Sequence, residues 1–152
     1  MKIEKKLQSL KIVLPKTPRP LANYVVAVQT GSLLFISGHG PYPDGKTVMV
    51  GKVGKELTLE EGYQTARNVT INCLASVRET LGDLDRVKRV VKLLGMVHCT
   101  EDFKEQPKVI NGCSDLLVEI FGEIGKHARS AVGMQALPNG IPVEIEMILE
   151  VG

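Results

Sequence analysis

One segment, residues 129–147, constrains the fold of this chain most, because its pattern is typical of two β-strands joined by a tight turn. The turn lies at 138–140, where the sequence Pro-Asn-Gly combines a fixed φ angle with two residues that accept positive φ at low cost. The second strand alternates strictly between apolar and acidic residues, as a strand with one buried face does. Its apolar positions are Val143, Ile145 and Met147, and its acidic positions are Glu144 and Glu146. We therefore expect an apolar β-hairpin that lies inside a sheet.

Two charged residues of this hairpin are candidates for chemistry. Arg129 begins the first strand and Glu144 begins the second, so a hairpin with its tip at 139–140 would place both toward its open end. A cation and an acid on rigid strands could hold a small anion and polarise a water molecule beside it. The alternative is a structural ion pair or two solvated charges. The residue types alone favour this alternative, because most charged side chains lie at the surface.

The length and composition indicate one globular domain without a nucleic-acid footprint. We place the domain at 1–152, with residues 1–20 as an N-terminal extension, because 152 residues can bury a sizeable core. The net charge is +2, and three Phe, three Tyr and no Trp offer few surfaces on which bases could stack. Nucleic acid is therefore not favoured as a partner.

The cysteines and the N-terminus bear on cofactors and location. Cys73, Cys99 and Cys113 are odd in number and form no CxxC motif, so we expect reduced thiols rather than a disulfide framework or a metal site. We expect no metal and no organic cofactor. The N-terminus lacks an apolar signal core and no run approaches the length of a membrane span, so we expect a cytoplasmic protein without a membrane partner.

The remaining segments predict an α+β fold. Thr58 and Glu61 form a capping box that opens a helix, and Gly82 ends it. The order β-β-(β)-α-β-α-β-β indicates a small antiparallel or mixed sheet with two helices on one face. The predicted helices are 2–10, 59–81 and 107–124, and the predicted strands before the hairpin are 24–28, 33–37 and 88–99, with an optional edge strand at 47–50 inside a long loop, 42–56. The first two strands lack alternation, so we expect them to be buried on both faces.

The sheet face that carries no helices is expected to stay partly apolar. The residues that we assign to it are Val25, Leu34, Ile36, Val91 and Val132. An uncovered apolar face favours self-association, so we expect a cyclic homo-oligomer.

Six short motifs together resemble the RidA/YjgF family, also called L-PSP endoribonucleases. The resemblance covers about residues 20–151 and implies a chorismate-mutase-like fold, a homotrimer and a cleft between neighbouring subunits. It also implies hydrolysis of enamine and imine intermediates, such as 2-aminoacrylate, to 2-keto acids and ammonia without a metal or cofactor. The motifs are Ala22-Asn23-Tyr24, Phe35-Ile36-Ser37-Gly38, Val109-Ile110-Asn111, Arg129-Ser130, Leu137-Pro138 and Val143-Glu144-Ile145-Glu146.

The resemblance also implies roles for individual residues. Arg129 matches the arginine that binds a substrate carboxylate, and Glu144 matches the acid that holds the water. The residues that match the lining of the cleft are Tyr24, Ser37, Gly38 and Asn111. The chain departs from many active members at Ala131, where they carry Cys, and this concerns the substrate range. Its N-terminal segment and its loop at 42–56 are longer than in compact members, so it resembles a longer subgroup of the family, in which the loop could reshape the cleft.

Two other functions remain open from the sequence. A trimer could bind a keto acid in the same cleft for regulation, without turnover. An RNA-directed activity would use the basic cluster Arg86, Lys88, Arg89 and Lys92. The sequence favours it least, because His39, His98 and His127 are scattered over different elements and offer no catalytic His pair.

Overall fold

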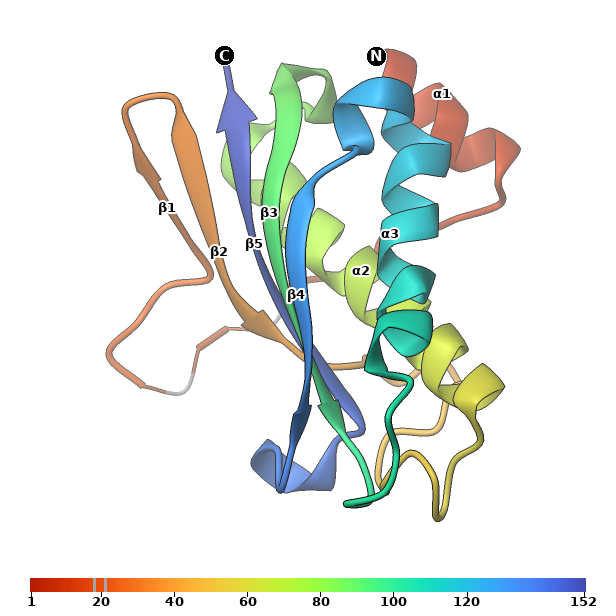
Figure 1. Ribbon diagram of the computed structural model, residues 1–152. Helices are drawn as coiled ribbons and strands as arrows, with labels where there is room; N and C mark the ends of the chain where they lie inside the picture. Colours follow the sequence, from red (N-terminus) through yellow and green to blue (C-terminus); the bar gives the residue numbers. More distant parts are fainter. Residues whose placement is uncertain (18, 21) are drawn as a thin grey trace.

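The computed structural model describes residues 1–17, 19–20 and 22–152, and it confirms the predicted α+β class (Figure 1). Within these ranges one mixed sheet has the strand order β1-β2-β5-β3-β4. The helices are α1 (Lys2–Ser9), α2 (Leu59–Leu81) and α3 (Gln106–Phe121), and the strands are β1 (Ala27–Thr30), β2 (Leu33–His39), β3 (Val87–His98), β4 (Ala128–Met134) and β5 (Val143–Val151). Short 3-10 turns lie at η1 (Leu84–Arg86), η2 (Gly122–Gly125) and η3 (Pro138–Gly140).

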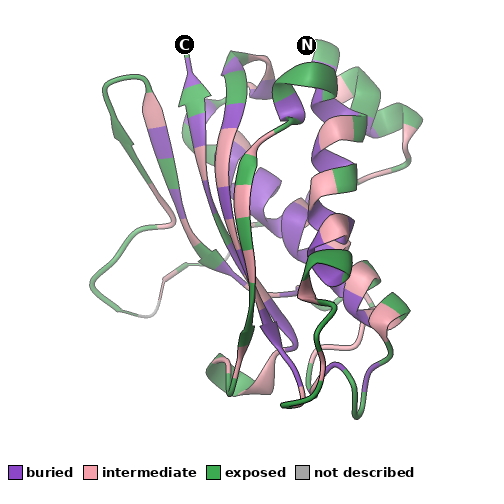
Figure 2. Cartoon of the chain, viewed as in Figure 1, coloured by how far each residue is buried: buried purple, intermediate pink, exposed green. Residues whose placement is uncertain are grey.

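Helices α2 and α3 cover one face of the sheet, which we call the helix face, and leave the other, the open face, without helices (Figure 1). The two layers enclose the core, which is built from aliphatic residues of α2, α3 and the inner sides of the strands (Figure 2). The three cysteines are buried thiols. Each helix in the described ranges falls short of the length or apolar character that a bilayer span requires.

The helix α2 begins and ends where local sequence signals predict. The Thr58 hydroxyl accepts a hydrogen bond from the Glu61 amide, and the Glu61 carboxylate accepts one from the Thr58 amide, so the capping box forms. Gly82 ends the helix at φ +79°, a conformation that glycine adopts without steric cost. The helix buries one long stripe against the sheet, because apolar side chains recur at helical spacing.

The predicted hairpin at 129–147 is wrong, because β3 lies between its two strands. β4 pairs with β3 in parallel, whereas β5 pairs antiparallel with both β3 and β2. The turn itself forms, with Asn139 at φ +58° and Gly140 at φ +70°. β5 alternates between buried and exposed residues along its whole length and takes the centre of the sheet, whereas β4 is mostly exposed and takes an edge. The core therefore gains more from β5 beside β2 and β3 than from a local hairpin.

Other differences from the predicted elements are local. The first strand begins at Ala27 rather than at residue 24 and is largely exposed, not buried on both faces. The described segment 47–50 forms no strand. α3 ends at Phe121, three residues early, because Gly122 takes φ +67°.

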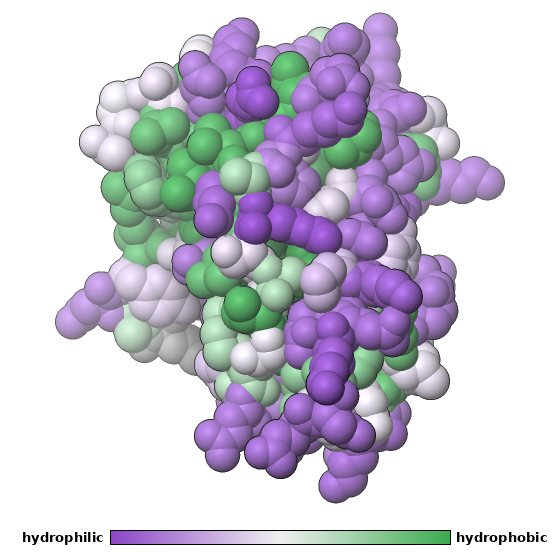
Figure 3. Space-filling model, in the orientation of Figure 1, coloured by the Kyte–Doolittle hydropathy of each residue, from purple (hydrophilic) through white to green (hydrophobic). Residues whose placement is uncertain are grey.

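The apolar residues of the open face also differ in part from the prediction. Leu34 and Ile36 belong to the helix face, where they are 0% and 4% exposed. Val28 and Phe35 take their place in the open layer and, like Val132, expose more than a third of their surface. Figure 3 shows apolar surface gathered on the side of the molecule that β1 and β2 form.

Candidate active site

Arg129 lies on the edge strand β4 and is directed to the helix face. It is in register with Leu93 of β3, which is fully buried under the helices, and residues in register point to the same face. Its guanidinium reaches α3: Nη1 donates to Ser114 Oγ at 3.0 Å, and Nη2 donates to the carbonyl oxygen of Pro107 at 3.3 Å. These two contacts hold the cation at the rim between the sheet edge and α3, where the side chain remains half-buried.

Asn111 stands on the same side of α3 as both contacts of Arg129. Pro107, Asn111 and Ser114 are spaced by four and three residues, which places them on one helix face. Asn111 is half-buried between the two turns that hold the guanidinium. We call Asn111, Ser114 and Arg129 the edge cluster.

His127 completes the contacts behind the edge cluster. Its Nε2 lies 2.9 Å from Ser114 Oγ, and its Nδ1 lies 2.7 Å from the carbonyl oxygen of Gly125. Burial lowers the pKa of His127, and the positive charge of Arg129 lowers it as well, whereas the hydrogen bond to Gly125 raises it. Sequence reasoning missed Ser114 as part of the site, although its position one turn after Asn111 on a helix was a usable signal.

Glu144 lies on the open face at the start of β5. It is in register with Met96 of β3, and its carboxylate lies directly over Gly38 of β2. A side chain at position 38 would collide with Glu144 Oε2, so the glycine makes room for the carboxylate. Burial raises the pKa of Glu144, and the neighbouring charge of Glu146 raises it further. A carboxyl group in this environment accepts a proton more readily than an exposed one.

Ser37 precedes Gly38 on β2, and it connects this strand to the segment that carries Tyr24. The Ser37 hydroxyl donates to the carbonyl oxygen of Val25 at 2.6 Å, and its amide donates to that of Val26 at 2.9 Å. These bonds tie the segment that carries Tyr24 to β2, and Tyr24 is 56% exposed there. We call Tyr24, Ser37, Gly38 and Glu144 the open-face group.

The structure thus divides the six predicted site residues into two groups on opposite faces. Arg129 is in register with position 93 of β3 and Glu144 with position 96, and an odd separation on a strand places side chains on opposite faces. The expectation that both residues meet at the open end of one hairpin is therefore wrong. A single chain does not bring the guanidinium and the carboxylate together.

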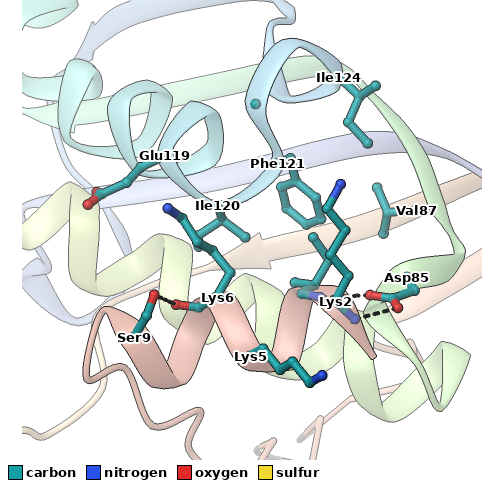
Figure 4. A pocket seen from close by; sticks show the side chains of 12 residues that line it. Lys2, Lys5, Lys6, Ser9, Asp85, Val87, Glu119, Ile120, Phe121 and Ile124 are labelled. Carbon is teal, nitrogen blue, oxygen red and sulfur yellow. Dashed lines mark hydrogen bonds between the residues drawn. The ribbon is translucent and has the colours of Figure 1, made fainter.

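Two cavities differ in their relation to these groups: one adjoins the open-face group, and the other adjoins neither group. A groove of about 480 Å³ runs across the open face, and its lining includes Ser37, Lys92, Ser130 and Glu146. A second cavity, of about 720 Å³, lies between α1 and the end of α3, and its lining includes no residue of either group (Figure 4). Lys2 and Lys6 stand over its apolar floor, which includes Phe121. Among the described residues no three His, Cys, Asp or Glu side chains gather as a metal site would require.

Comparisons with known proteins agree with this architecture. Residues 4–143 match the family described as "YjgF/chorismate mutase-like, putative endoribonuclease". The chain is 45% identical to Protein TCP17 of Trypanosoma cruzi over 145 residues, which cover 95% of this chain and 91% of that protein. A solved structure of a protein of unknown function from Agrobacterium tumefaciens is 41% identical, with a TM-score of 0.91, and the match covers 99% of this chain and 92% of that one. A structure from Shewanella oneidensis with the same endoribonuclease description is 33% identical, with a TM-score of 0.94, over 99% of this chain and all of that one.

Proposed function

Because the chain belongs to the YjgF/chorismate mutase-like family, we propose that it hydrolyses small enamine and imine intermediates of amino acids to 2-keto acids and ammonia. The substrates are of the 2-aminoacrylate and 2-iminopropionate type, and the reaction needs no metal and no organic cofactor. The site lies between two copies of the chain, in a homotrimer.

The geometry of Arg129 carries this proposal. Its guanidinium is fixed by Ser114 and Pro107 at the edge of the sheet, yet those two contacts leave other N–H groups of the fork for a ligand. A planar carboxylate fits such a fork with two parallel charge-assisted hydrogen bonds. Each bond contributes about 1.5–3 kcal/mol when water is excluded. Asn111, on the adjacent helix face, can donate a further hydrogen bond from its amide.

Glu144 supplies the acid–base chemistry. Its raised pKa favours acceptance of a proton from a water molecule that attacks the imine carbon. Attack gives a carbinolamine, and the same carboxyl group returns the proton to its nitrogen. The C–N bond then breaks as the hydroxyl oxygen forms the keto C=O bond and gives up its proton, so that ammonia leaves. A protonated imine is already an electrophile, so positioning the substrate and the water is the main task of the site. The Glu144 carboxylate lies over Gly38, and Ser37 precedes that glycine on β2, so we assign the orientation of the water to these two residues.

Two copies are needed because the edge cluster and the open-face group lie on opposite faces of one chain. β4 stands at an edge of the sheet, so Arg129 and the α3 residues that hold it lie at the rim of the chain. The open face presents Val28, Phe35 and Val132, whose exposed apolar surface favours association. In the proposed assembly, Arg129 and Asn111 of one copy face Glu144, Gly38, Ser37 and Tyr24 of the next.

Release of ammonia or 2-keto acid from freshly generated 2-iminopropionate tests the proposal. Arg129→Ala should lose most of its kcat/KM, because the carboxylate loses its main partner. Glu144→Gln should still bind 2-oxobutyrate but release little ammonia, because the amide cannot accept a proton. Arg129→Ala with the wild-type rate would rule out the proposed site. If the wild type shows no turnover, and both it and Glu144→Gln bind 2-oxobutyrate, the result would point instead to a keto-acid-binding regulator.

The family description also includes endoribonuclease activity, and the residues offer less support for it. His39 is buried and bonded to Ser76 and the Ser37 carbonyl, and His127 is held behind Arg129. Among the described residues, neither ring is hydrogen-bonded to a second histidine, as an acid–base pair for RNA cleavage would favour. Salt-dependent RNA binding that disappears when the basic cluster at 86–92 is neutralised would favour this second function over the first.

A further inference from the structure

Ser114 and His127 form a continuous hydrogen-bond chain behind Arg129. The chain runs from the guanidinium on β4 to Ser114 on α3, then to His127, and ends at the Gly125 carbonyl in η2. Its members come from β4, α3, η2 and the short link between η2 and β4 that carries His127. The acid–base scheme above assigns no step to Ser114 or His127.

We propose that Ser114 and His127 are positioning residues that fix the guanidinium of Arg129, with His127 held as the neutral Nδ1–H tautomer. This inference rests on the proposed function only in taking Arg129 as the group that binds the substrate carboxylate. Neither residue touches the substrate; both act through Arg129.

The proton positions follow from the donors and acceptors in the chain. A guanidinium only donates, so Ser114 Oγ accepts from Arg129 Nη1 and must direct its own proton elsewhere. The other hydrogen-bond partner of Ser114 Oγ among the described residues is His127 Nε2, 2.9 Å away, which must then carry no proton. The Gly125 carbonyl only accepts, so His127 Nδ1 carries the ring proton. Each of these three contacts thus has one donor and one acceptor.

A protonated His127 would break this order. Both ring nitrogens would donate, and Ser114 Oγ would lie between two cations while its own proton lost the acceptor that His127 provides. The burial of His127 and the nearby charge of Arg129 both lower the pKa of the ring and keep it neutral. The guanidinium makes two hydrogen bonds to described residues. Loss of Ser114 would remove one and leave the bond to the Pro107 carbonyl, at 3.3 Å. One long contact fixes the direction of a planar group less well than two.

Replacing His127 by asparagine or by glutamine tests its two hydrogen bonds, to Gly125 and to Ser114, one at a time. The amide of asparagine reaches the place of Nδ1, so His127→Asn keeps a donor for Gly125 and removes the acceptor for Ser114. The amide of glutamine reaches the place of Nε2, so His127→Gln keeps the acceptor and removes the donor. Ser114→Ala removes the partner of Arg129 itself. Asp115→Asn, at the next position of α3, is the matched control for changes in the helix.

Kinetics and binding give the first readout. We expect the KM for 2-iminopropionate and the Kd for 2-oxobutyrate to rise about tenfold in Ser114→Ala and His127→Asn, roughly the effect of one hydrogen bond to a charged group. The effect on kcat should be smaller, because the network aims the group that binds the carboxylate. His127→Gln should recover most of the affinity that His127→Asn loses. Equal losses in the two His127 variants, or no loss in Ser114→Ala, would overturn the inference.

Nitrogen-15 NMR gives a second readout that does not depend on turnover. We expect the His127 ring as the Nδ1–H tautomer at neutral pH, and an Arg129 Nε–H signal that broadens in Ser114→Ala and His127→Asn but not in His127→Gln. An Nε2–H tautomer, or an Arg129 signal indifferent to all three variants, would refute the positioning role even in an active enzyme. If the protein neither turns over the imine nor binds the keto acid, the proposed function is rejected. If its spectra are nevertheless as expected, the positioning role still stands.

Discussion

Two inactive variants, mixed in one oligomer, test whether the site is shared between chains. In one chain, Arg129 and Glu144 are two strands apart and three residues out of register. Strand spacing and rise put about 10 Å across the sheet and about 10 Å along it, so their Cα atoms lie about 14 Å apart. Their side chains also leave the sheet on opposite faces and diverge further. The proposed site would therefore take its guanidinium and its carboxylate from different chains.

The expected yield follows from random mixing. In oligomers assembled from equal amounts of Arg129→Ala and Glu144→Gln chains, a site between two chains is intact when each supplies its unmodified residue, which occurs at about a quarter of sites. Each variant alone has no intact site. The mixture should thus recover about a quarter of the wild-type rate of imine hydrolysis, measured as ammonia release.

A second mixture serves as the control. Wild-type chains mixed equally with the Arg129→Ala/Glu144→Gln double variant should also retain about a quarter of the rate if the site is shared, but about half if each chain holds its own site. Native mass spectrometry would establish that the oligomers are mixed. Mixed oligomers of the two single variants with no recovered activity would refute the shared site.

Three further predictions concern the acid and the packing. The kcat/KM should fall as the pH drops through a value above the ordinary 4.5 of a glutamate, because the raised pKa of Glu144 leaves the base protonated there; Glu146→Gln should move this fall to lower pH, and an unmoved profile would contradict the coupling. Gly112→Ala should lower the free energy of unfolding by about 3 kcal/mol in chemical denaturation, because a Cβ there collides with the Tyr63 carbonyl of α2, whereas an unchanged midpoint would argue against the close crossing of α2 and α3. Thr58→Ala should lower the free energy of unfolding by about 1 kcal/mol in the same measurement, whereas Thr58→Ser should keep it, because the serine hydroxyl can still cap the helix. Equal losses in both variants would show that the cap is not the cause.

The sequence predicted best what local chemistry determines. The capping box at Thr58 and the glycine at position 82 placed both ends of α2, and the Pro-Asn-Gly turn at 138–140 adopted the positive φ angles expected of it. The family resemblance read from short motifs is confirmed by the match over residues 4–143. In each case the signal lies within a few residues of its consequence.

The pairing of strands and the contacts between elements were not accessible in this way. Nothing near residues 129–147 states that β3 will enter between β4 and β5, because that choice depends on how β2, β3 and β5 together cover the core. The contact of Arg129 with Ser114 joins residues on different elements, so the site was predicted without Ser114. The roles of Arg129 and Glu144 in turnover remain predictions.

The central place of β5 has a consequence for how the chain can fold during synthesis. β1 and β2 form one half of the sheet and β3 and β4 the other, and β5 is the strand that joins them. A ribosome delivers β5 after every other described strand, so the edges of β2 and β3 that pair with β5 lack their partner until Val143–Val151 has emerged from the exit tunnel. Closure of the sheet is thus a late, cooperative event, and a nascent chain paused before Val143 would offer chaperones and proteases both open edges.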